Sequence, residues 1–267
     1  MNLKHIFRPS NISLVREMVI SDFKLRYKNS VLGYLWSLLR PLLLFGVLYI
    51  VFTQVFKVGK NIPYYPAYLL LGIVVWTFFV EATMSGLNAI TGRGDLVRKV
   101  SISKYVIVVS TTLSAFVNFC LNMVVVFIFM VLNGVPLRIN ALLVPFLIIE
   151  LVALSLGIAF LLSALFVKYR DFSNIWEVVL QGLFYATPII YDLRQPPVKT
   201  AKFLIISPIA QIIQDLRSVL ITPKTLTIST LYGSHFYRLI PFGIIIVICI
   251  VGGLYFRKNS PYFAEDL

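Results

Sequence analysis

Long apolar runs constrain this chain more than any other feature. Six stretches lie close to the roughly 20 mostly apolar residues that a helix needs to cross a bilayer. They cover residues 35–56, 67–90, 105–132, 141–167, 175–191 and 237–256. Only 13% of the 267 residues are charged, about half the share of a soluble globular protein. The sequence therefore predicts an all-α membrane protein, one domain over residues 1–267 with six transmembrane helices.

The orientation follows from the basic residues that separate these runs. Lys and Arg gather before the first run, after the second, after the fourth and after the sixth, whereas the first two connections on the other side carry few. Short cytoplasmic segments are enriched in basic residues, so both termini are expected in the cytoplasm. The net charge of +13 is then explained by orientation and anionic lipid headgroups, and no nucleic-acid partner is expected.

Residues 11–29 precede the first run and have helical spacing. Glu17, Lys24 and Lys28 fall on one polar face together with Ser13 and Ser21. This pattern predicts an N-terminal amphipathic, interfacial helix on the cytoplasmic leaflet. A helix that packs on a soluble partner fits the same pattern equally well, and both readings can hold together.

Residues 192–236 form a connection that is too long for a hairpin loop and too apolar for a disordered one. Pro196-Pro197, Ser207-Pro208 and Pro223 interrupt its apolar runs. Irregular backbone at membrane depth is tolerated only where protein or a water-filled cavity shields it. We therefore expect short re-entrant helices between the fifth and sixth spans, and a role in lining a pore is favoured over a free loop.

No motif for chemistry or for energy conversion is present in the sequence. It contains no phosphate loop, no H-E-x-x-H pair, no nucleophile elbow and no plausible catalytic triad. We expect no catalytic residue, no metal and no cofactor in this chain. If the protein transports uphill, an ion gradient or another subunit must supply the energy.

Polar residues inside the predicted spans are costly and therefore informative. Ser114, Asn118 and Asn122 recur at i, i+4 and i+8 on the third span, so they form one stripe. The stripe is interpreted either as helix–helix contact or as the wall of a hydrophilic channel. Glu81 and Glu150 lie in the second and fourth spans; a proton relay through them is the weaker alternative.

Aromatic residues line two of the predicted spans. The channel-lining candidates on the first span are Trp36, Tyr49 and Phe52, and those on the fifth are Phe184 and Tyr185. A Trp near a span end, such as Trp36, is typical of the interfacial aromatic belt. Flat rings also stack on planar partners with little sequence preference, and by analogy they can stack on sugars.

Three short motifs resemble those of ABC-2 type permeases that export polysaccharides. Leu32-Gly33-Tyr34-Leu35-Trp36-Ser37-Leu38-Leu39-Arg40-Pro41 matches the family's L-G-x-x-W-x-x-L-x-P signature. Lys168-Tyr169-Arg170-Asp171-Phe172 is similar to its aromatic-Arg-Asp turn, with Arg170 and Asp171 as structural residues. Thr187-Pro188-Ile189-Ile190-Tyr191 is similar to the end of its fifth span. The layout agrees across essentially the whole chain.

The resemblance implies a mechanism and partners. Such permeases are homodimers in the bacterial inner membrane, with two copies of a separate ATPase subunit that binds ATP and Mg. The substrate would be a polysaccharide on an undecaprenyl diphosphate carrier, as in O-antigen, capsule and teichoic-acid export. A permease for a drug, peptide or other lipid is the alternative. A membrane enzyme acting on lipid-linked sugars is a third.

The same resemblance assigns roles to further residues. The family's coupling segment lies between the second and third spans, here about residues 94–104, which offers Asp95, Leu96, Val97, Arg98 and Lys99 to the ATPase. Arg98 and Lys99 are alternatively plain positive-inside residues. Arg40 is a candidate contact for the carrier diphosphate, and snorkelling to lipid headgroups is its alternative role.

Overall fold

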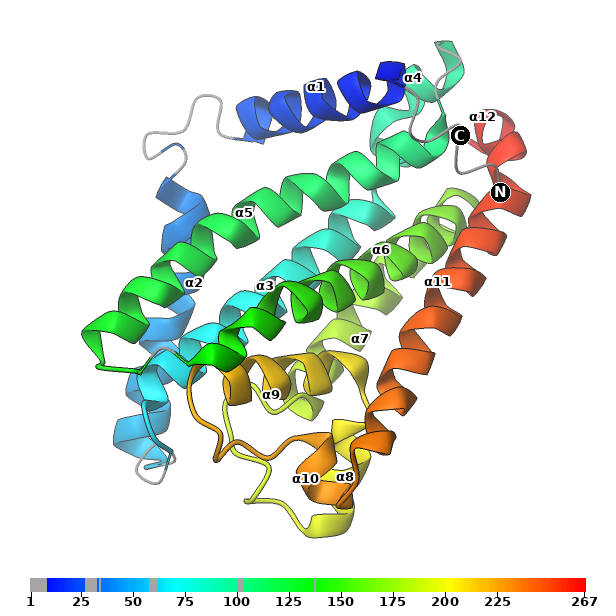
Figure 1. Cartoon of the computed structure of the whole chain (residues 1–267). Coiled ribbons are helices and arrows are strands. Elements are labelled where there is room, and N and C mark those ends of the chain that lie inside the picture. The colour runs from blue at the N-terminus through cyan, green and yellow to red at the C-terminus, as the bar shows by residue number, and fades with distance from the viewer. Residues whose placement is uncertain (1–8, 27–32, 34, 58–61, 100–102, 137) are drawn as a thin grey trace.

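The computed structural model describes residues 9–26, 33, 35–57, 62–99, 103–136 and 138–267, and in this part of the chain every regular element is helical. The long helices are α2 (Leu35–Ile50), α3 (Tyr65–Leu87), α5 (Lys104–Leu132), α6 (Val144–Lys168), α7 (Phe172–Ala186) and α11 (Leu239–Asn259). Helix α2 continues as the π-helical turn η2 (Val51–Val55), and the 3₁₀ turn η5 (Ile139–Leu143) precedes α6. Figure 1 shows α3, α5, α6 and α11 running the length of the molecule. The all-helical prediction is confirmed.

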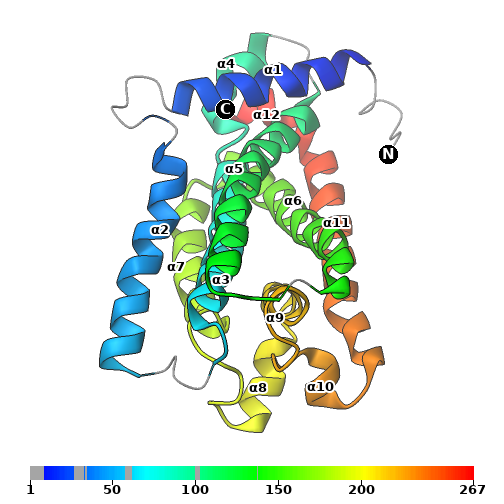
Figure 2. The same ribbon diagram turned by 60° about the vertical axis from the view of Figure 1, so that its left-hand side comes forward.

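Helix α3 forms the centre of the bundle. Its most apolar 18-residue window is 78% buried, whereas the corresponding window of α2 is only 11% buried. A helix that is apolar on all sides is buried either by protein neighbours or by lipid. For α3 the neighbours are α2, α5, α6, α7 and α9 (Pro208–Leu220), which all contact it. Helix α2 stands at the side of the bundle (Figure 2), so most of its apolar surface is left for lipid or for another chain.

The predicted fifth span differs most from the structure. Among the described residues, five helices are long and apolar enough to cross a membrane, and α7 is not one of them. It has 15 residues, or about 22 Å at 1.5 Å per residue, short of a hydrocarbon core of about 30 Å. The helix ends before Thr187, which is extended with ψ 132°, because the proline that follows disfavours the helical conformation in the residue before it. The prediction of a helix up to residue 191 was therefore wrong at its end.

The connection between α7 and α11 contains the short helices predicted for it. Helix α8 (Val198–Ile205) and helix α9 (Pro208–Leu220) meet at an angle of 100°, and together they are apolar enough for one broken span or a re-entrant loop. The break falls at Ser207-Pro208. Helix α10 (Ile228–Tyr232) and the 3₁₀ turn η6 (His235–Arg238) lead into α11. The depth of these helices in the membrane stays a prediction.

Three short or lateral helices gather at the opposite end of the bundle. Figure 1 shows α1 (Pro9–Arg26), α4 (Gly94–Lys99) and α12 (Phe263–Asp266) there, close to the chain's C-terminus. Buried Met18 of α1 shares an apolar cluster with Val97 of α4 and Phe263 of α12. Glu17 and Lys24 are exposed on α1, and the amphipathic, interfacial character of this helix stays a prediction. The apolar residue Ile12 of the same helix is 56% exposed.

Candidate functional site

A cavity of about 1120 Å³ opens between α2, α3, α5 and α7. Its lining combines aromatic, charged and amide side chains: Trp36, Ser37, Arg40, Pro41, Leu44, Trp76, Thr77, Val80, Glu81, Met84, Ser85, Asn118, Asn122, Glu177, Leu180, Gln181, Phe184 and Tyr185. Seven of the residues that the sequence analysis discussed individually therefore lie at one site: Trp36, Arg40, Glu81, Asn118, Asn122, Phe184 and Tyr185. Their role in transport stays a prediction.

Aromatic rings from three helices meet in this cavity. The rings of Trp76 and Phe184 lie edge to face with centroids 5.7 Å apart, and Phe184 contacts Tyr185 in the same way at 5.4 Å. Trp36 is 46% exposed and Tyr185 is 74% exposed. Ring faces at the wall and at the mouth of a cavity can contact the apolar faces of a ligand without fixing its register.

The polar stripe on α5 fastens three helices together at the cavity wall. Asn122 Nδ2 donates to the backbone carbonyl oxygen of Ser37 on α2 at 3.1 Å. Asn118 Nδ2 donates to Glu81 Oε1 on α3 at 2.7 Å. Both asparagines are buried and line the cavity. The sequence left helix contact and channel wall as alternatives, and the geometry gives these side chains both positions.

The cavity carries ionisable side chains of both signs. Arg40 of α2 lines it, as do Glu81 of α3 and Glu177 of α7. Guanidinium groups bind phosphate through paired hydrogen bonds, whereas amides and carboxylates accept or exchange hydrogen bonds with hydroxyl groups. The wall is therefore suited to a ligand that has an anionic part and a polyhydroxylated part. Among the described residues, no cluster of three or more His, Cys, Asp or Glu side chains could hold a metal ion.

Two predicted channel residues do not line this cavity. Tyr49 stacks on Phe45 and on Tyr65, with ring centroids 5.6 and 6.3 Å apart. Phe52 stacks on Phe56 at 5.2 Å in the π-helical turn that ends α2. Both rings pack against the main apolar core, one to three turns along α2 from the cavity residues.

The predicted coupling segment begins with a short helix. The 3₁₀ turn η4 (Thr91–Arg93) leads directly into α4. Val97 is 7% exposed and Leu96 packs against the same apolar cluster, so both side chains serve the fold of this chain. Asp95 and Arg98 are exposed and are free to meet a partner. The side chains of Lys99 and Lys28 lie outside the described residues.

The Arg170–Asp171 turn joins α6 to α7. Asp171 is the N-terminal flanking residue of α7, and its side chain makes no capping hydrogen bond. The Arg170 guanidinium lies over the ring of Phe166, 5.3 Å from its centroid. These positions fit a structural turn.

Sequence reasoning missed a buried arginine behind the cavity. Arg217 of α9 is fully buried and donates to the backbone carbonyl oxygens of Tyr68, Pro188 and Ile189 at 3.1, 2.5 and 2.6 Å. It thereby ties the predicted re-entrant segment to α3 and to the end of α7. The sequence did hold a signal for this arginine, because it is the single Arg in the apolar run 209–221. An ionisable residue in such a run needs a charged or hydrogen-bonding partner. Trp76, Glu177 and Gln181 were likewise not predicted to line the cavity.

Comparison with known proteins agrees with the resemblance seen in the sequence. The family model described as ABC-2 type transporter matches residues 13–221, a range that contains every helix around the cavity. Two proteins of Klebsiella pneumoniae, each described as O-antigen export system permease protein RfbA, are 28% identical over 249 residues, or 92% of both chains. A protein of Myxococcus xanthus with the same description is 29% identical over 73% of this chain and 74% of its own length. This multi-pass membrane chain belongs to the ABC-2 type transporter family.

Proposed function

We propose that this chain is the membrane-spanning permease of an exporter for a lipid-linked polysaccharide of the O-antigen type. The substrate is a glycan on undecaprenyl diphosphate, which moves from the cytoplasmic face to the outer face of the bacterial inner membrane. Separate ATPase subunits bind ATP and Mg and drive the movement. The descriptions of the K. pneumoniae and M. xanthus relatives support the substrate class, and the family supports a transport subunit rather than an enzyme.

The cavity between α2, α3, α5 and α7 is the observation that carries this proposal. A lipid-linked glycan presents a diphosphate, sugar hydroxyls and the flat apolar faces of its rings. Arg40 suits the diphosphate, Asn118 and Gln181 suit the hydroxyls, and Trp36 and Tyr185 suit the ring faces. These side chains line one cavity. Stacking permits a long polymer to slide through it.

The low burial of α2 supports a homodimer. Leu43, Val47, Ile50 and Val55 of α2 and its continuation are 57–68% exposed, which leaves an apolar surface next to the cavity. A second copy of this chain would cover part of that surface and would complete the path for a polymer. Two ATPase subunits, one for each permease, then bind at the end that carries α1, α4 and α12.

The packing around α4 supports a route for coupling. Exposed Asp95 and Arg98 are the proposed ATPase contacts, while Val97 on the same helix packs with Met18 of α1 and Phe256 of α11. A displacement of α4 would therefore be transmitted to the N-terminal helix and to the base of the last span. This is how closure of the ATPase on ATP would reach the bundle.

Export in a strain that lacks the chromosomal copy tests the substrate class. Without the permease, lipid-linked polymer should accumulate in the cytoplasm and surface glycan should be lost. Arg40→Gln should reproduce much of this defect, and Arg138→Gln should not, because Arg138 lies between α5 and α6 away from the cavity. Normal surface glycan in the deletion strain would contradict the proposed substrate.

Co-purification with the ATPase tests the coupling role separately. Arg98→Glu reverses an exposed charge on α4 and should weaken both ATPase binding and the stimulation of ATP hydrolysis by the permease. Arg194→Glu is the matched control, since Arg194 is exposed and shortly precedes α8, which lies at the opposite end of the bundle from α4 (Figure 1). Unchanged binding and stimulation for Arg98→Glu would remove α4 from the coupling interface.

A further inference from the structure

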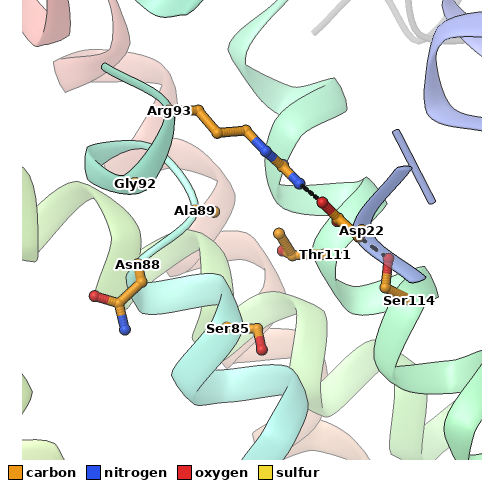
Figure 3. A pocket seen from close by; sticks show the side chains of 8 residues that line it. All are labelled: Asp22, Ser85, Asn88, Ala89, Gly92, Arg93, Thr111 and Ser114. Carbon is orange, nitrogen blue, oxygen red and sulfur yellow. Dashed lines mark hydrogen bonds and ion pairs between the residues drawn. The ribbon is translucent and has the colours of Figure 1, made fainter. Parts of the chain in front are cut away.

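A second, smaller cavity adjoins the large one and has a different lining. It has a volume of about 450 Å³ and lies between α1, the end of α3, η4 and α5. Figure 3 shows the eight residues around it: Asp22, Ser85, Asn88, Ala89, Gly92, Arg93, Thr111 and Ser114. Ser85 lines both cavities, so the two cavities meet at this part of α3. None of the described residues that line the smaller cavity is aromatic.

The two charged side chains of the smaller cavity neutralise each other. Arg93 Nη2 forms an ion pair with Asp22 Oδ1 (Figure 3). The second carboxylate oxygen of Asp22 accepts from Ser114 Oγ at 3.3 Å, and Arg93 Nη1 donates to Ser110 Oγ at 3.4 Å. With its guanidinium occupied in this way, the cavity is a poor site for a phosphate group. Its chemistry therefore differs from that of the cavity with Arg40.

The remaining polar groups of this cavity suit a neutral ligand with several hydroxyls. Ser85 contributes a hydroxyl group, and the Thr111 and Ser114 hydroxyls, which donate to protein oxygens, offer their acceptor lone pairs. Asn88 uses one amide hydrogen on the Met84 carbonyl and retains its second hydrogen and its carbonyl oxygen. The Asp22 carboxylate adds further acceptor sites. A volume of about 450 Å³ exceeds what one sugar ring fills. Mixed donors and acceptors without net charge match a sugar better than an anion or an apolar chain.

We infer that the smaller cavity is a sugar-binding subsite, which holds a neutral glycosyl residue of the substrate while Arg40 holds the diphosphate in the large cavity. The inference rests on the proposed function, because it divides the head of one lipid-linked glycan between two adjoining cavities. The inference adds a site that recognises the sugar itself. This site lies between the C-terminal part of α1 and the turn η4, which leads into α4. A bound sugar there contacts both arms of the Asp22–Arg93 pair.

Filling the cavity tests the subsite in the complete transporter. A Cβ atom at Gly92 meets no other atom within 4 Å, and Gly92 is part of the cavity wall, so Gly92→Leu adds bulk at the wall without a clash at Cβ. Gly253→Leu is the matched control, since a Cβ atom there also meets nothing within 4 Å and Gly253 lines neither cavity. Export should fall at least about tenfold for Gly92→Leu and should stay normal for Gly253→Leu. Normal export by Gly92→Leu would overturn the inference.

A labelling experiment tests sugar binding without transport. Asn88→Cys is introduced after Cys120 and Cys249 have been replaced by Ala, and its modification by a thiol reagent is followed in the purified permease–ATPase complex. Millimolar neutral hexoses or deoxyhexoses should slow the modification several-fold, and inorganic pyrophosphate should not. Protection by pyrophosphate alone, or by neither probe, would overturn the inference, the former because it indicates an anion site.

The two proposals fail in different ways. If Arg40→Gln abolishes export while Gly92→Leu exports normally and sugars give no protection, only the subsite is wrong. If the deletion strain displays normal surface glycan, the proposed function is wrong, and sugar protection at Asn88→Cys would then indicate another carbohydrate substrate. If Gly92→Leu also loses ATPase binding, its export defect would be explained by a disturbed α4 and not by a blocked cavity. That result would also overturn the inference.

Discussion

Asn122 on α5 donates a hydrogen bond to the backbone carbonyl of Ser37 on α2. This is the carbonyl whose usual helical donor is missing because Pro41 stands four residues later. In a regular helix the N–H of residue 41 would bond the carbonyl of Ser37, but proline has no N–H. Asn122 Nδ2 takes that place at a distance of 3.1 Å. This hydrogen bond attaches α2, most of which is exposed, to the bundle next to the cavity residues Trp36 and Arg40.

The first prediction concerns this attachment. Asn122→Leu keeps a similar volume but removes the donor. It should destabilise the protein by about 0.6 kcal/mol and by no more than about 1.7 kcal/mol, the mean and the maximum for hydrogen bonds between membrane helices. A lower thermal midpoint and faster spin-label motion on α2 should report it. Asn133→Leu is the control, because Asn133 Nδ2 bonds only Phe129 of its own helix. Equal effects of the two changes would show that the Ser37 contact contributes nothing.

The helical period explains why part of this site was predictable from sequence. Residues at i, i+4 and i+8 share one helix face, so Ser114, Asn118 and Asn122 were expected to act together. All three do make contacts between helices, with Asp22, Glu81 and Ser37 respectively. Sequence alone did not identify these partners, which lie 37 to 92 positions away along the chain.

Long-range packing explains what the sequence did not reveal. The partners of Arg217 are backbone carbonyls, and backbone groups carry no signature in the sequence. Gly72 gives no warning either, although a Cβ atom at that position would lie 2.4 Å from Arg217 Nη2. The early end of α7 was a missed local signal, since Thr187-Pro188 marks a boundary. Tyr49 and Phe52 are of the aromatic type expected in a channel wall, but the packing of α2 in the fold decides which way their side chains point.

The second prediction concerns Arg217. Arg217→Met removes the donors from three buried carbonyl groups, and leaving buried acceptors unpaired costs about 1–3 kcal/mol each. We expect a loss of at least about 2 kcal/mol in stability, measured by thermal unfolding of the purified protein. Arg217→Lys should recover only part, since a point ammonium replaces a planar fork of donors.

Arg194→Met is the surface control for this experiment. Its guanidinium bonds the backbone carbonyl of Lys224 at an exposed site, where substitutions usually change stability by less than about 0.5 kcal/mol. A midpoint for Arg217→Met that matches the Arg194→Met value would show that the buried hydrogen bonds do not hold α9 against α3.

The third prediction concerns orientation, which follows from the distribution of basic residues. In a background without Cys120 and Cys249, Lys224→Cys should react with a membrane-impermeant thiol reagent in intact spheroplasts. Glu265→Cys at the opposite end should react only after permeabilisation. Both side chains are exposed, so access to the reagent depends on the side of the membrane. The reverse pattern would place both termini outside.

The fourth prediction concerns the contact between α6 and α11. At Gly252 a Cβ atom would lie 2.2 Å from the carbonyl oxygen of Gly157, whereas at the adjacent Gly253 it would meet nothing within 4 Å. Small residues at a helix crossing let two backbones approach closely, and here the close neighbour is backbone that cannot rotate away. Gly252→Ala must therefore push α11 from α6.

The two glycines form a matched pair for this experiment. Gly252→Ala should cost about 1–3 kcal/mol, as overpacking in a close-packed core does. Gly253→Ala should be neutral or should stabilise the helix by up to about 1 kcal/mol, since alanine is the better helix former. Thermal midpoints of the two variants, measured in the same detergent, give the comparison. Both variants carry the same substitution at adjacent positions of α11, so they differ only in what the new methyl group contacts. Equal stability of Gly252→Ala and Gly253→Ala would therefore mean that α6 and α11 do not cross at this point.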